Sequence, residues 1–155
     1  MDSRFAALVE HLAPKLDALL KMPPIRDGRL PRGMPMSGVY LFSDGEKHLY
    51  VGRSNYLKRR YGRHTLPSAQ QHQAAFAFKW TRERTGHTEA AYAQEGGRKW
   101  LIAQPAFLEE FTAAKIRIRA LDYRYVEETD QNRQALLEIY AAVVLNTPYN
   151  DFGTH

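Results

Sequence analysis

The sequence contains no cysteine, and this absence removes several kinds of chemistry at once. A disulfide framework, a zinc-thiolate site and a thiol nucleophile are excluded, so any metal must be held by oxygen or imidazole ligands. Long hydrophobic runs are also missing. Residues 1–5 contain an acidic residue and lead into an amphipathic pattern. A secretory signal or a membrane span needs an unbroken apolar run. We therefore expect a cytoplasmic protein that does not use a membrane.

The composition that remains is that of a single folded domain with a basic surface. The chain has 155 residues, of which 44% are hydrophobic and 12% aromatic, enough apolar material for a buried core. Lysine and arginine number 22 against 17 aspartate and glutamate residues, which gives a formal net charge of +5. A basic balance suits a polyanionic partner such as nucleic acid, although many unrelated proteins share it.

The first thirty residues predict a helical extension followed by a linker or an ordered coil. Apolar residues recur at three- and four-residue steps, which describes one face of a helix capped by Asp2 or Ser3. These residues are Phe5, Leu8, Val9, Leu12, Leu16, Leu19 and Leu20. Pro14 should kink or split that helix. Residues 22–35 are rich in proline and glycine, so we expect an extension over residues 1–30 and the main domain over residues 31–155.

The pattern after this coil predicts a hairpin, a short basic helix, a strand and a final helix. Residues 37–42 and 48–52 are apolar, β-branched or aromatic runs, and the Asp44-Gly45 pair between them is a hairpin turn signal. Residues 55–64 form the basic helix, capped by Ser54 or Asn55, and residues 115–123 alternate as a strand. The final helix covers residues 131–145 and stops at Pro148, with core residues Leu136, Leu137, Tyr140, Val143 and Val144.

Residues 65–114 form an insertion with weaker patterns. They contain a polar loop at 67–73, an ambiguous apolar run at 74–80, and helical stretches near 89–94 and 97–102. The expected fold is α/β, with a small sheet of three or four strands flanked by helices and preceded by the N-terminal helical extension. An antiparallel hairpin supplies two of these strands.

Two tripeptides on the predicted hairpin carry a family resemblance. Gly38-Val39-Tyr40 on the first strand and Tyr50-Val51-Gly52 on the second, followed by the basic run at 57–60, resemble the paired motifs of the GIY-YIG nuclease superfamily. Within it, the pattern is similar to the N-terminal nuclease domain of the bacterial excision-repair protein UvrC and to GIY-YIG type II restriction enzymes. The valines that stand in place of isoleucine are conservative apolar changes.

The second half of the family's pattern also occurs, in the same order. It is a helix that carries a glutamate, here Glu138, and is followed by Pro148 and Asn150. His64 follows Arg60 by four residues, one helical turn, where several family members carry a histidine or tyrosine. The resemblance covers residues 37–64 and 115–150 and does not extend to the insertion or to the N-terminal helix. It implies the family's small sheet and a DNA endonuclease that needs Mg²⁺ or Mn²⁺.

Phosphodiester hydrolysis needs an activated water, stabilised charge on the phosphate and a proton for the leaving oxygen. The single carboxylate of Glu138 suits a hard cation whose other ligands are water and phosphate oxygens, which predicts one-metal chemistry. Arg60 stays charged and presents a planar fork to phosphate oxygens. Tyr40 and Tyr50 supply phenols on adjacent strands.

The resemblance also implies roles for single residues. It makes Tyr50 the general base, lets His64 aid proton transfer, and has Asn150 orient groups or the scissile phosphate. A phenol has an ordinary pKa near 10, so Tyr50 can act as a base only if the metal or a nearby cation lowers that pKa. Arg53 and Arg60 are the candidate cations.

Each of these residues also has a plainer interpretation. Tyr40 and Tyr50 would ordinarily be core aromatics, Glu138 a surface residue of its helix, and Asn150 a helix cap. The predicted nucleic-acid contacts are generic phosphate ligands, and they are Arg53, Lys58, Arg59 and Arg63. The alternative function is therefore a catalytically silent nucleic-acid-binding module. The sequence does not decide between a monomer and a weak homodimer.

Overall fold

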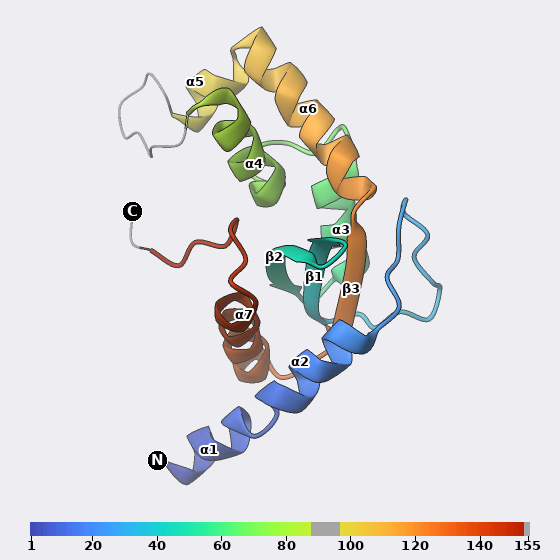
Figure 1. Cartoon of the computed structure of the whole chain (residues 1–155), viewed down its shortest axis with the longest axis vertical. Helices are drawn as coiled ribbons and strands as arrows, with labels where there is room; N and C mark the ends of the chain where they lie inside the picture. The colour runs from blue at the N-terminus through green and yellow to red at the C-terminus, as the bar shows by residue number, and fades with distance from the viewer. Residues whose placement is uncertain (88–96, 154–155) are drawn as a thin grey trace. The chain divides into compact units, whose positions relative to one another are not determined.

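The computed structural model describes residues 1–87 and 97–153, which fall into two compact units (Figure 1). The first unit contains Met1–Arg60 and Leu121–Asn150, and the second contains Tyr61–Ala120 and Asp151–His155. The boundary between them falls inside helix α3 (Leu57–Thr65). The first unit contains the sheet, and the described part of the second contains helices and connecting segments.

The sheet of the first unit has three antiparallel strands, β1 (Gly38–Asp44), β2 (Lys47–Ser54) and β3 (Asp122–Glu127), in the order β2-β1-β3. The predicted hairpin is confirmed, with Gly45 at φ +59° in its turn. Only a residue without a Cβ adopts this left-handed backbone at little cost. The predicted α/β class is also confirmed, with three strands in the described residues and helices flanking them.

The N-terminal extension forms two helices, α1 (Ser3–Val9) and α2 (Leu12–Lys21). The Asp2 side chain caps α1 by accepting hydrogen bonds from the Arg4 and Phe5 amides, as one of the two predicted caps should. Pro14 lies in the first turn of α2, where its missing N–H is not needed. The coil that follows is ordered, because Ile25 and Tyr123 exchange both backbone hydrogen bonds.

The last helix, α7 (Gln131–Leu145), has the predicted bounds, and its buried face was predicted in part. Leu137 is buried as predicted, beside Ala141 and Ala142, and the predicted Leu136 and Tyr140 pack against this core. Val143 and Val144 were also expected in the core but are 69% and 55% exposed. The helix ends before Pro148, at Asn146 in the left-handed conformation with φ +51°.

The strand predicted at residues 115–123 is wrong. Residues 115–119 end α6 (Pro105–Arg119), and only residues 122 and 123 of the predicted range belong to a strand, β3. The alternating Ile116 and Ile118 resemble a strand over five residues, but Ile118 is fully buried and Ile116 is 55% exposed on a helix. The helical period becomes visible only over the whole of α6. Its buried residues recur at steps of three or four, or are adjacent, and they are Phe107, Phe111, Ala114, Lys115 and Ile118.

The second unit contains α4 (Ala75–Thr85), α5 (Arg98–Ile102) and α6. Its core is aromatic, because the Phe78 ring contacts those of Phe107 and Phe111 at 5.4 and 6.0 Å between centroids. The Lys115 ammonium donates to the carbonyls of Pro67 and Ala69 and so holds the polar loop against α6. The predicted helical stretch at 89–94 lies outside the described residues. The predicted domain limits and insertion remain predictions.

Candidate active site

The glycine of the second tripeptide makes room for the tyrosine of the first. Tyr40 pairs with Gly52 across the β1–β2 ladder. A Cβ built on Gly52 would lie 2.2 Å from both Cζ and Oη of Tyr40, far inside van der Waals contact. The Tyr40 ring therefore lies directly over the Gly52 backbone and is buried, with 1% of its surface exposed. Any larger residue at position 52 would displace this ring.

The glycine of the first tripeptide, Gly38, is also required by a close approach. A Cβ on Gly38 would lie 2.0 Å from the carbonyl oxygen of Val126 in β3. Because that neighbour is backbone, it cannot move aside as a flexible side chain could. The two glycines thus let β1 approach β3 and let Tyr40 lie across β2, and each is required by close approach.

Tyr40 and Tyr50 lie beside one another, with ring centroids 6.4 Å apart. Arg60 from α3 donates a side-chain hydrogen bond to Tyr40, and its charge also acts on Tyr50. Burial raises the pKa of Tyr40 well above its usual range, and burial together with Glu138 raises the pKa of Tyr50 to about 12. Arg60 opposes both shifts, but desolvation outweighs it. Both phenols therefore keep their protons at neutral pH.

Glu138 faces this group from α7. Its carboxylate lies 3.7 Å from the Arg53 guanidinium of β2 and accepts a hydrogen bond from the Arg53 backbone amide. Burial raises the pKa of Glu138 above its usual value, and the charges of Arg53 and Arg60 partly offset that rise. The side chain keeps 23% of its surface exposed, so a ligand can still reach it. Tyr50, Arg60 and Glu138 are thus electrostatically coupled within one unit.

Asn55 holds the beginning of α7 at the end of β2. Its side-chain amide exchanges hydrogen bonds with Gln131 at 3.2 and 2.7 Å, and its oxygen also accepts from Gln134 at 3.1 Å. Gln134 is buried and donates in addition to the Glu128 carbonyl. Three neutral amides therefore fix the first turn of the helix that carries Glu138.

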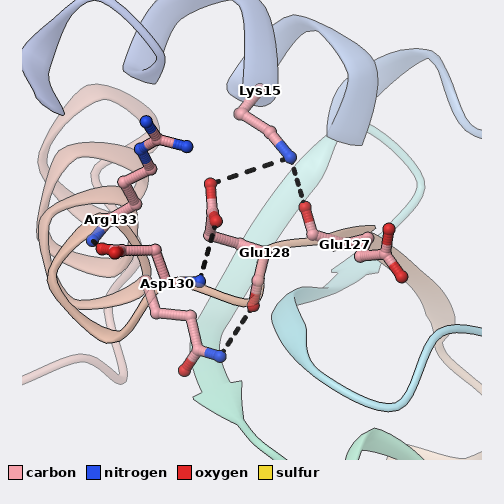
Figure 2. A network of polar contacts seen from close by, with 6 residues as sticks. Lys15, Glu127, Glu128, Asp130 and Arg133 are labelled. Carbon is pink, nitrogen blue, oxygen red and sulfur yellow. Dashed lines mark hydrogen bonds and ion pairs between the residues drawn. The ribbon is translucent and has the colours of Figure 1, made fainter. Parts of the chain in front are cut away.

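Lys15 adds a second support at the same place. Figure 2 shows it reaching from α2 to the Glu128 carboxylate, at 3.7 Å, and to the Glu127 carbonyl. Glu128 in turn accepts from the Asp130 amide, and Asp130 caps α7 by accepting from the Arg133 amide at 2.9 Å. Glu128 is 4% exposed, so its buried oxygens depend on these partners for hydrogen bonds. The N-terminal extension is therefore part of what positions α7.

Asn150 fixes the far side of α7 to the free edge of β2. Its Oδ1 accepts from the Val51 amide at 2.8 Å and its Nδ2 donates to the Val51 carbonyl at 2.7 Å. The Thr147 hydroxyl donates to the same Oδ1 at 2.6 Å, and the Tyr149 amide donates to the Leu49 carbonyl. The interpretation of Asn150 as a helix cap is wrong, because Asn146 ends α7. Residues 149 and 150 instead cover the outer edge of the strand that carries Tyr50.

The remaining predicted site residues separate into two groups. Lys58 and Arg59 are exposed on the first turn of α3, as phosphate contacts should be. Arg63 and His64 belong to the second unit, where His64 is 1% exposed with its ring 6.4 Å from that of Phe76. Their proposed roles stay predictions. Within the described residues, no group of three or more histidine, aspartate or glutamate side chains gathers as a metal site.

Sequence reasoning missed the residues that support this site. Arg53 was expected to contact phosphate, but it pairs with Glu138. Its position directly after the second tripeptide could have indicated that it lies at the site. Asn55 and Gln131 lie 76 residues apart, and no local pattern in one sequence indicates that they meet. Lys15 and Glu128 are still farther apart in the sequence, and no local pattern indicates that they meet either.

Residues 36–100 match the model of the GIY-YIG catalytic domain. No curated protein and no solved structure matches the chain. In the described part of the chain, every helix is too short or too polar to cross a membrane.

Proposed function

We propose that this member of the GIY-YIG nuclease superfamily is a divalent-metal-dependent endonuclease that hydrolyses DNA phosphodiester bonds. The observation that carries the proposal is the coupling of Tyr50, Arg60 and Glu138 in one unit, beside a hairpin whose two glycines make room for the tyrosines. A binding module has no need for a half-buried carboxylate close to a buried phenol. The basic net charge of +5 suits DNA as the substrate.

The donor set fits Mg²⁺ or Mn²⁺. Glu138 supplies a hard carboxylate that remains reachable, and such a cation keeps most of its waters when one or two carboxylates bind it. When bound, the cation would lower the pKa of a coordinated water and neutralise charge on the phosphate. Arg53 also pairs with the Glu138 carboxylate at 3.7 Å, which restrains its orientation.

The chain's own residues would then divide the remaining work. Arg60 is anchored on Tyr40 and presents a permanent charge to the phosphate oxygens. Tyr50 holds its proton at neutral pH, because its pKa is about 12. We propose that its hydroxyl accepts a proton from the attacking water while it passes its own proton to a solvent water, as a relay rather than as a phenolate. Asn150 acts as a positioning residue for the strand that carries Tyr50.

The deciding experiment is digestion of end-labelled single-stranded, duplex and branched DNA with Mg²⁺, with Mn²⁺ and with EDTA. We expect cleavage of at least one substrate with metal only, and its loss in Glu138→Gln. Thermal unfolding gives a readout that does not depend on turnover, since Mg²⁺ or Mn²⁺ should raise the Tm of wild type more than that of the variant. Metal-independent DNA binding without cleavage of any substrate would favour the silent binding module instead.

A further inference from the structure

A pocket of about 490 Å³ lies between the coil before β1 and the first turn of α3, and neither Tyr50, Arg60 nor Glu138 lines it. Its volume falls in the range of sites for small organic ligands, about 300–1,000 Å³. Every lining residue belongs to the first unit, and they are Arg32, Met34, Pro35, Met36, Tyr56, Leu57, Lys58 and Arg59.

The walls of this pocket are fixed by backbone contacts. The Leu57 amide at the start of α3 donates to the Met36 carbonyl at 2.8 Å, which joins the two sides. The Tyr56 amide donates to the Ser54 hydroxyl at 2.9 Å, and the Leu57 side chain is fully buried beneath. The pocket is therefore part of the fold.

The lining combines a flat cationic platform with an apolar wall. Tyr56 is 53% exposed, and the Arg59 guanidinium lies 4.6 Å from the centre of its ring. Met34, Pro35 and the 70% exposed Met36 supply apolar surface. Arg32 and Lys58 add positive charge. Aromatic and guanidinium planes are the surfaces on which unpaired nucleobases stack, and cations beside them bind the sugar-phosphate backbone.

We propose that this pocket binds one unpaired nucleotide of single-stranded DNA, next to the bond that is cut. The base stacks on Tyr56 and Arg59, and its phosphates contact Lys58 and Arg32. A base inside a duplex has both faces covered by its neighbours, so only an unpaired base can enter. Arg60 follows Arg59 in the same helix but turns to Tyr40, which places the pocket beside the catalytic group and apart from it. This proposal rests on the nuclease function and names its substrate class.

The test measures binding in EDTA, so that cleavage does not interfere. A fluorescein-labelled single strand is compared with a set of strands in which one abasic position moves along the sequence. We expect one abasic position to weaken wild-type binding by about five-fold to a hundred-fold, the effect of losing one stacked base. Tyr56→Ala should weaken binding to the intact strand by a similar factor and should be insensitive to that abasic position. Tyr56→Phe keeps the ring and should behave as wild type.

Lys58→Ala is the matched control, because it should lose affinity equally for intact and abasic strands. Fully paired duplex of the same sequence should bind wild type and Tyr56→Ala alike. The pocket proposal is wrong if Tyr56→Ala and the abasic site have additive effects on the binding free energy at every position. It is also wrong if Tyr56→Ala weakens duplex binding as much as single-strand binding. If wild type cleaves DNA but Tyr56→Ala stays sensitive to the abasic position, the nuclease proposal stands and the pocket proposal is wrong. If Tyr56→Ala loses that sensitivity but no metal-dependent cleavage occurs, the pocket proposal stands and the nuclease proposal is wrong.

Discussion

At the scale of single residues, burial of the Glu138 carboxylate destabilises the fold, and the charges of Arg53 and Arg60 only partly offset this effect. Its folded pKa is raised above the unfolded value, so the free energy of unfolding should fall as pH rises through the window between those two values and then level off. Glu138→Gln should therefore be more stable than wild type at neutral pH and lose this pH dependence. Urea unfolding between pH 4 and pH 8 measures it. A variant that is less stable at pH 7 would show that the Arg53 pair outweighs the burial.

Tyr50 makes a separate prediction, because its hydroxyl is meant to move a proton. Tyr50→Phe should lower single-turnover cleavage by about 10²- to 10⁴-fold, the usual contribution of proton transfer, while DNA affinity in EDTA stays unchanged. The folded phenol keeps its proton up to about pH 12, whereas an unfolded tyrosine loses it near pH 10. Wild-type stability should thus fall between these values, and the variant should fall less. Unchanged cleavage by the variant would remove Tyr50 from the chemistry.

At the scale of elements, α7 is fixed to β2 at both ends, and the Asn150 contact is open to a simple test. Asn150→Ala leaves the buried Val51 amide and carbonyl without their partner, which should lower the free energy of unfolding by about 2 kcal/mol or more. Cleavage should fall at the same time with little change in DNA affinity, because β2 carries Tyr50. Asn146→Gly is the control, since it removes an amide four residues earlier at a left-handed position that glycine accepts.

The outcome for Asn150 distinguishes positioning from direct participation. A variant with wild-type stability and strongly reduced cleavage would mean that the Asn150 amide touches substrate. Parallel losses of stability and cleavage would support the edge contact seen here. Asn55→Ala offers an independent measure at the opposite end of α7, where the lost bonds are to Gln131 and Gln134.

The elements also show where sequence reasoning succeeds. The hairpin and α7 could be predicted because each has strong local signals, an Asp-Gly turn in one and a stop at Pro148 in the other. The strand misplaced at 115–123 failed because a short alternation of Ile116 and Ile118 fits two periods equally well. The buried face of α7 was predicted only in part, since Leu137 is buried but Ala141 and Ala142 complete the core and Val143 and Val144 are exposed.

The catalytic candidates on β1, β2, α3 and α7 came from two motifs about a hundred residues apart, and a motif match locates residues without explaining them. The structure adds the physical reasons, namely the two close approaches at Gly38 and Gly52. The supporting contacts of Asn55 and Lys15 depend on long-range packing. A single sequence has no signal for such pairs.

At the scale of the whole molecule, the positive charge should appear in the salt dependence of DNA binding. The logarithm of the binding constant should fall linearly with the logarithm of salt concentration, because each phosphate contact releases counterions. Lys58→Ala and Arg32→Ala, which remove the proposed phosphate contacts, should each reduce the slope by about one unit. Anisotropy titrations from 50 to 300 mM salt measure this, with Arg119→Ala, a cation on α6 outside the proposed site, as the control. A slope that neither variant changes would place the DNA elsewhere.

The overlap between Tyr40 and the space above Gly52 has a consequence for how this chain can evolve. Neither position can vary alone, because a methyl group at position 52 would clash with the Tyr40 ring and a smaller residue at position 40 would leave a cavity. Substitutions at the two sites should therefore appear together or not at all in descendants of this gene. Insertions should be tolerated in the turn at Gly45 and Glu46, where the strands have already parted, and purged between residues 40 and 42 or 50 and 52, where one extra residue would slide the ring off its glycine.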